Sequence, residues 1–147
     1  MQHRKWAPVV WATWIFATSC TVVARDPFIR WVQNHLPNGM TRALWSEGWL
    51  RFGIVVVKTY HVSEFAFLCV LATGALRACN LKLEQALALG ASGCLVYAAS
   101  DEWHQTFVPG RGGTWVDVCI DALGIGLASL WIVRRARRAV AHGSTAR

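Results

Sequence analysis

Four long apolar runs constrain the fold of this chain more than any other feature of its sequence. In the hydrocarbon core of a membrane every backbone N–H and C=O must find a partner within the protein, which favours helices. A crossing helix needs about 20 apolar residues. The runs therefore predict an all-α integral membrane protein, a four-helix bundle forming a single domain, with helices over about residues 6–24, 53–76, 83–100 and 115–133 and a frayed basic tail over residues 134–147.

The composition supports a membrane protein over a soluble domain. Charged residues make up 16% of the chain, well below the roughly 25% that is usual in soluble domains. Nine tryptophans are present, and tryptophan concentrates at membrane–water interfaces. Trp45 and Trp49, one helical turn apart, predict a short interfacial helix within the mixed segment 25–53, whose alternative is a plain connecting segment. The five cysteines form no CxxC pair and predict no disulfide framework.

The first apolar run, residues 6–24, has two interpretations. Val22-Val23-Ala24 resembles the cleavage site of a signal peptide. An apolar run of this length can also span a bilayer. We expect it to be retained as the first transmembrane helix.

The net charge of +7 is concentrated beside the apolar runs. Arg4 and Lys5 precede the first run, and four arginines follow the last within residues 134–138. Basic residues favour the cytoplasmic side, so we expect both termini and the link 77–82 in the cytoplasm, although the segment 25–58 is also basic. Because no base-stacking or groove-reading motif accompanies this charge, the expected partner is the lipid bilayer of a bacterial cell membrane and not nucleic acid.

Ionisable residues gather at one end of three of the expected helices. Because consecutive helices run in opposite directions, these ends lie at one depth in the membrane. Lys58, His61 and Glu64 are three residues apart, and Asp117 and Asp121 are four apart, so each of these two sets follows one helical face. The residues at this depth are Lys58, His61 and Glu64, then Asp101, Glu102, His104 and Gln105, then Asp117 and Asp121, with Arg111 in an expected polar loop over residues 101–114.

Asp121 is strongly constrained by its position. A charge at the centre of a membrane helix costs roughly 2.5–3.5 kcal/mol and less near the interface, and Asp121 lies about a turn and a half inside the fourth run. Gly124 and Ala128 continue its face with small side chains, which permit close helix packing. We therefore expect this face to point toward partner helices, with Asp121 paired, protonated or beside a wet cavity.

Two pairs of residues are candidates for acid–base catalysis. Glu102 with His104, and His61 with Glu64, each place a carboxyl group near an imidazole in sequence. The same residue types could ligate a metal, but their spacing matches no established metal signature. The sequence therefore predicts no metal site and no cofactor.

The other polar residues are candidates for binding a ligand. Arg111 and Lys58 are suited to a phosphate or carboxylate group of a headgroup. The candidate substrate-binding residues are Lys58, Glu64, Asp101, Gln105, Arg111, Asp117 and Asp121.

Two motifs carry most of these residues. One is Lys58-x-x-His61-x-x-Glu64-Phe65, and the more specific one is Asp101-Glu102-x-His104-Gln105-x-Phe107-x-Pro109-Gly110-Arg111, followed by Asp117 and Gly124. In these motifs, which span about residues 55–130, the chain resembles the VanZ-like family of small bacterial membrane proteins. It departs from the family where Asp121 replaces a common asparagine and Phe65 a common tyrosine. The resemblance implies a similar four-helix layout, these site residues and, because the family is named for a teicoplanin-resistance protein, a role in antibiotic resistance.

We expect the protein to bind or modify an anionic cell-envelope molecule, such as a lipid-linked cell-wall precursor or a headgroup, in an outward-facing polar pocket. The alternative is a structural or interaction protein whose polar cluster only holds the helices together, since polar groups join transmembrane helices by about 1 kcal/mol or less. A proton-coupled carrier using Asp121 is a third hypothesis. It is disfavoured because no acid or base continues into the opposite halves of the helices.

Overall fold

The computed structural model describes residues 3–20 and 25–144, and the regular structure of this part of the chain is entirely helical. The helices are α1 (His3–Ser19), α2 (Arg25–His35), α3 (Gly39–Arg77), α4 (Leu83–Gln105) and α5 (Trp115–Ser144). The prediction of an all-α protein is confirmed. Two stretches of the described residues, Arg51–Arg77 and Trp115–Ala139, are helices long and apolar enough to cross a membrane, so two of the four expected spans meet that criterion.

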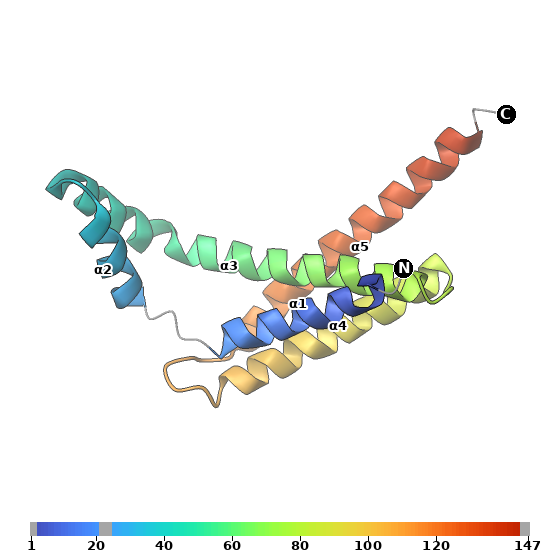
Figure 1. Cartoon of the computed structure of the whole chain (residues 1–147), viewed down its shortest axis with the longest axis horizontal. Helices are drawn as coiled ribbons and strands as arrows, with labels where there is room; N and C mark the ends of the chain where they lie inside the picture. The colour runs from blue at the N-terminus through green and yellow to red at the C-terminus, as the bar shows by residue number, and fades with distance from the viewer. Residues whose placement is uncertain (1–2, 21–24, 145–147) are drawn as a thin grey trace.

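Helix α3 is the centre of the arrangement, because it contacts α1, α2, α4 and α5. Helices α1 and α4 run in one direction beside it, while α3 and α5 run in the other (Figure 1). The carboxyl-terminal half of α5 leaves the bundle, as do α2 and the first turns of α3 at the opposite end (Figure 1). The helices α1, α3, α4 and α5 therefore alternate in direction along the chain, as expected.

The core is built from small and medium side chains where α1, α3, α4 and α5 meet. Gly124 marks a close approach of α5 to α3, because a Cβ atom there would lie 2.2 Å from the carbonyl oxygen of Val62. Asp121, Gly124 and Ala128 are all buried, which confirms that this face points toward partner helices. The buried apolar residues are Ile15, Phe65, Leu68, Cys69, Cys94, Ala98, Ile125 and Ala128.

The outer surface is largely apolar, whereas several charged side chains are inside. Side chains such as Ile54, Val96 and Trp115 are more than two-thirds exposed. Buried charged side chains include Glu64, Asp101, Glu102 and Asp121. Soluble proteins show the opposite tendency, since their acids are almost never fully buried unless paired.

Helix α3 begins well before residue 53, the start expected from the apolar run. The side chain of Asn38 accepts a hydrogen bond from the Thr41 N–H at 2.9 Å, and such a cap starts a helix. Asn38 therefore caps the start of α3. Trp45 and Trp49, with ring centroids 5.7 Å apart, belong to this same helix and do not form a separate interfacial one.

The expected loop and tail boundaries also differ from the structure. Helix α4 includes residues 101–105, so the polar loop spans only residues 106–114. Helix α5 continues to Ser144, so the basic residues 134–144 are helical and not frayed, because arginine and alanine are strong helix formers. Segment 25–53 contains the unexpected α2. The cleavage-like residues 22–24 and the last residues, 145–147, lie outside the described part of the chain.

Candidate functional site

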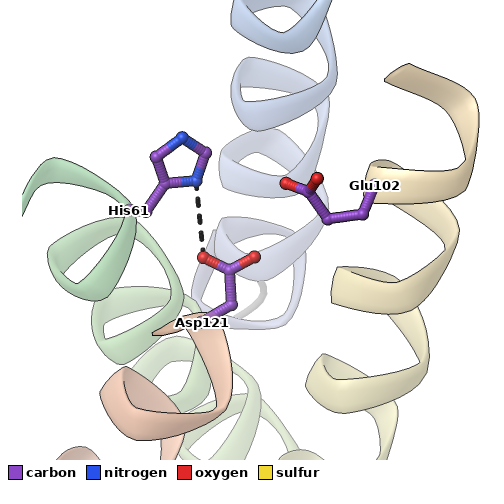
Figure 2. A group of neighbouring side chains, drawn as sticks. All are labelled: His61, Glu102 and Asp121. Carbon is purple, nitrogen blue, oxygen red and sulfur yellow. Dashed lines mark ion pairs between the residues drawn. The ribbon is translucent and has the colours of Figure 1, made fainter. Parts of the chain in front are cut away.

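Three ionisable side chains from three helices point toward one another where α3, α4 and α5 meet (Figure 2). They are His61 from α3, Glu102 from α4 and Asp121 from α5, and one potential ligand atom of each lies within 4.8 Å of the others. His61 Nδ1 is 3.4 Å from Asp121 Oδ1. We call these residues the buried trio, since the His61 side chain is 14% exposed, that of Asp121 is fully buried and Glu102 is also buried.

The close packing of α5 on α3 sets the position of two members of the trio. Gly124 lies one turn after Asp121 and brings the backbone of α5 against Val62, which follows His61 directly. Because a larger residue at 124 would force the helices apart, this contact also holds Asp121 near the His61 ring. The third member, Glu102, comes from the last turn of α4.

A chain of hydrogen bonds runs from α1 through the end of α4 to the following loop. Asp101 accepts hydrogen bonds from Ser19 Oγ and Gln105 Nε2, both at 2.8 Å. Gln105 Nε2 also donates to Glu102 at 3.2 Å, and the Thr114 N–H donates to Glu102 at 3.0 Å. Ser19 and Thr114 were not predicted as site residues, because an isolated hydroxyl at the end of an apolar run or loop carries no distinguishing signal.

The loop fits tightly against the end of α4. A Cβ atom on Gly113 would lie 1.8 Å from the backbone oxygen of Glu102, and Gly110 adopts a positive φ of 80°. Both positions therefore suit glycine. The loop that carries Arg111 is thus held beside the acidic end of α4.

The two predicted cationic residues, Lys58 and Arg111, are both partly buried but differ in their contacts. Lys58 forms an ion pair with Asp117, and their side chains are 33% and 14% exposed. Thr114 Oγ1 also donates to Asp117 at 3.1 Å. Arg111 is partly buried, and its Nε is buried without a hydrogen-bond partner among the described residues.

The two predicted acid–base pairs are not joined by hydrogen bonds in the described part of the chain. His104 faces α1, where its Nε2 lies 3.5 Å from Cys20 Sγ and its ring centroid 4.9 Å from that of Phe16. It is two residues from Glu102, a spacing at which helical side chains do not face each other. His61 contacts Asp121, not Glu64. Catalytic roles for His61, Glu102 and His104 stay predictions.

The interior of the cluster is rich in unsatisfied acceptors. Both carboxylate oxygens of Asp121, one of Glu64 and one of Asp101 are buried without a hydrogen-bond partner within residues 3–20 and 25–144. Glu102 lies just after the expected membrane span over residues 83–100. Burial raises the pKa of its carboxyl group, and the hydrogen bond from the Thr114 N–H partly offsets that rise. An interior of this kind attracts cations and hydrogen-bond donors.

A protein-family model described as VanZ/LLP1 matches residues 7–136, a range that includes every candidate site residue. No curated protein and no solved structure shows significant similarity to the chain.

Proposed function

The chain belongs to the VanZ/LLP1 family, and from this membership and the geometry of its polar cluster we propose that it is a multi-pass membrane protein that binds an anionic envelope molecule. The ligand class is an amphiphile with a phosphate-bearing headgroup, such as a lipid-linked cell-wall precursor. The polar cluster receives the headgroup, and the apolar outer surface lies in the bilayer.

The distribution of side chains supports the membrane setting. Helices over Arg51–Arg77 and Trp115–Ala139 are long and apolar enough to cross a bilayer. Large apolar side chains cover the outside, and buried acids lie within. Ionisable residues within membrane segments face the protein interior or a wet cavity and commonly mark functional sites. In this setting α1 and α4 complete a four-helix bundle around α3, with both ends of the chain on the cytoplasmic side.

The proposed ligand class rests on the side chain of Arg111. Its Nε is buried without a hydrogen-bond partner from the described residues. An unsatisfied buried donor costs about 1–3 kcal/mol and more when charged, and arginine binds phosphate and carboxylate oxygens through paired N–H groups. An anionic headgroup at the mouth of the cluster would supply the missing acceptor, with Lys58 close to the rim as a second cation.

A lipid titration tests this proposal. The purified chain in neutral detergent is titrated with a polyprenyl phosphate while its Tm is measured, and the polyprenol without the phosphate serves as the control lipid. We expect the phosphate lipid alone to raise the Tm. Arg111→Gln should weaken apparent affinity by about tenfold, because a hydrogen bond to a charged group contributes about 1.5–3 kcal/mol.

Arg51→Gln provides a matched control. Arg51 is an exposed arginine of α3 that pairs with Glu47 at 2.7 Å, so its loss should leave lipid affinity unchanged. Equal Tm shifts from the two lipids, or full affinity in the Arg111 variant, would refute the proposed ligand class.

The resistance role is tested in cells. Alanine variants at His104, Arg111 and Asp117 are compared with the unmodified chain for glycopeptide susceptibility, with membrane levels of each variant measured. We propose that the variants lose protection against teicoplanin. Unaltered susceptibility at equal expression would remove antibiotic resistance from the proposed function.

A purely structural role is the second candidate, and the hydrogen-bond chain from Ser19 to Thr114 favours it because those groups satisfy one another internally. A structural role predicts that Ser19→Ala and Arg111→Gln each lower the Tm of the protein. It also predicts that no lipid headgroup restores the lost stability. Headgroup-dependent stabilisation that needs Arg111 separates the two candidates.

A further inference from the structure

The buried trio has the composition and convergence of a metal site, and we propose that His61, Glu102 and Asp121 bind one divalent first-row transition cation, such as Zn²⁺ or Mn²⁺. The spacing of these residues along the chain gave no such indication, because each comes from a different helix.

The geometry requires little rearrangement. Potential ligand atoms of the three side chains lie within 4.8 Å of one another. In a tetrahedral site with bonds of about 2.1 Å, ligand atoms are roughly 3.4 Å apart. His61 Nδ1 and Asp121 Oδ1 are already 3.4 Å apart. The Glu102 carboxylate points into the same space (Figure 2), with a potential ligand oxygen within 4.8 Å of ligand atoms of both other residues, so a small shift toward them would bring in the third ligand.

Asp121 supplies an independent reason to expect a cation. Its side chain is fully buried, and neither carboxylate oxygen has a hydrogen-bond partner in the described part of the chain. It is aimed into the space between His61 and Glu102 (Figure 2). Buried charges are normally paired or coordinate metals, and the 3.4 Å contact with His61 engages only one of its two oxygens.

Hydrogen bonds outside the trio already orient one ligand. Glu102 accepts from Gln105 Nε2 and from the Thr114 N–H, one on each carboxylate oxygen. Such outer hydrogen bonds fix the direction of metal-ligating carboxylates, and their loss typically lowers metal affinity 10–100-fold. The end of α4 is therefore built to hold Glu102 toward α3 and α5.

The donor set selects the class of metal. Imidazole suits zinc, iron, copper and nickel, whereas carboxylates suit manganese, magnesium and calcium. One imidazole with two carboxylates therefore fits Zn²⁺ or Mn²⁺. Three protein ligands leave a coordination position open. This step rests on the proposed function: the open position would accept a phosphate oxygen of the ligand. The cation would also offset the repulsion that the acidic side chains exert on an anion.

The test is a metal titration without lipid. The full chain, purified with a tag that lacks histidine and stripped with a chelator, is titrated with Zn²⁺ or Mn²⁺ alone by calorimetry, and bound metal is measured by mass spectrometry. We expect about one equivalent per chain. Asp121→Asn, Glu102→Gln and His61→Gln should each weaken binding at least tenfold.

His35→Gln and Glu84→Gln are the matched controls, because each removes one imidazole or one carboxylate outside the trio. They should bind metal as the unmodified chain does. Absence of binding, or equal weakening in the controls, overturns the proposal. All variants are checked for helix content by circular dichroism.

A spectroscopic arm reports directly on the ligands of the bound metal. Co²⁺ bound to the unmodified chain should give visible absorption bands that change in His61→Gln, and an unchanged spectrum would exclude His61 as a ligand. Because no lipid is present, failure of this test leaves the lipid titration unaffected, and failure of lipid binding with metal binding intact would refute only the proposed function.

Discussion

The carboxylate of Asp121 is buried at an electrostatic cost that the described residues do not fully compensate. Among the described residues its ion-pair contact is with His61 Nδ1 at 3.4 Å, which is charged only when the imidazole is protonated, and neither of its oxygens has a hydrogen-bond partner there. Burying an unpaired charge costs much more than burying a neutral polar group. A residue that stabilised only the helix packing would be served better by a neutral side chain. This contrast separates a ligand-binding role from a structural one.

Asp121→Asn should therefore affect the metal-free and metal-bound protein differently. In chelator we expect the variant to have a Tm equal to or above that of the unmodified chain, since a neutral amide costs less to bury than a carboxylate whose oxygens lack hydrogen-bond partners. In Zn²⁺ only the unmodified chain should gain stability. Differential scanning fluorimetry in both conditions measures this. A variant that is equally destabilised with and without metal would instead assign Asp121 a structural pairing with His61.

Sequence patterns located the polar residues but could not group them correctly. Spacing of three or four residues correctly placed Asp121 and Gly124 on one buried face, because such residues are neighbours on any helix. The same rule cannot relate His61, Glu102 and Asp121, since their convergence depends on how three helices pack. Proximity in sequence also suggested pairing Glu102 with His104, which the helical continuation of α4 prevents.

The packing of α3 against α5 is the contact between elements on which the trio depends. A Cβ atom on Gly124 would lie 2.2 Å from the backbone oxygen of Val62. Backbone atoms of a helix cannot yield as a flexible side chain can, so a larger residue must separate the helices. Since His61 precedes Val62 and Asp121 lies one turn before Gly124, separation would also open the trio.

Gly124→Ala should destabilise the protein by about 1–3 kcal/mol, the usual cost of overpacking, even though alanine is the better helix former by up to about 1 kcal/mol. The control is Gly126→Ala on the same helix, where an added Cβ meets nothing within 4 Å. That substitution should leave the Tm unchanged or raise it. Thermal unfolding in detergent measures both. A similar Tm for the two variants would mean that α3 and α5 are not held at this distance.

The positions of helix ends show where sequence reasoning fell short at the scale of elements. The apolar run over 53–76 predicted a helix, but hydropathy carries no information about the polar turns that precede it. Those turns are helical because Asn38 caps them through the Thr41 N–H. At the other end of the chain, basic residues after 133 extend α5, because charge ends a membrane span without ending a helix.

The whole molecule combines an apolar exterior, an acidic interior cluster and helices of alternating direction. The amino-terminal end of α1, the turn over residues 78–82 and the carboxyl-terminal end of α5 lie toward one end of the bundle, and the loop over 106–114 lies toward the other (Figure 1). Hydropathy predicted four spans, of which Arg51–Arg77 and Trp115–Ala139 meet the criterion of length and composition. If α5 crosses the membrane, the loop and the carboxyl end must face opposite sides, and if α4 also crosses, residues 78–82 lie on the same side as the carboxyl end.

Reporter fusions test this arrangement. Green fluorescent protein or alkaline phosphatase is fused after Leu81, after Gly112 and at the carboxyl end. Because basic residues mark the cytoplasmic side and the tail of α5 carries Arg134, Arg135 and neighbouring arginines, we expect fluorescence for the first and third fusions and phosphatase activity for the second. The fusion after Leu81 is the internal control, since it should match the carboxyl end. Identical signals after Gly112 and at the carboxyl end would place both positions on one side of the membrane. That result would exclude a crossing by α5 and would refute the proposed location of the acidic cluster within a membrane-spanning bundle.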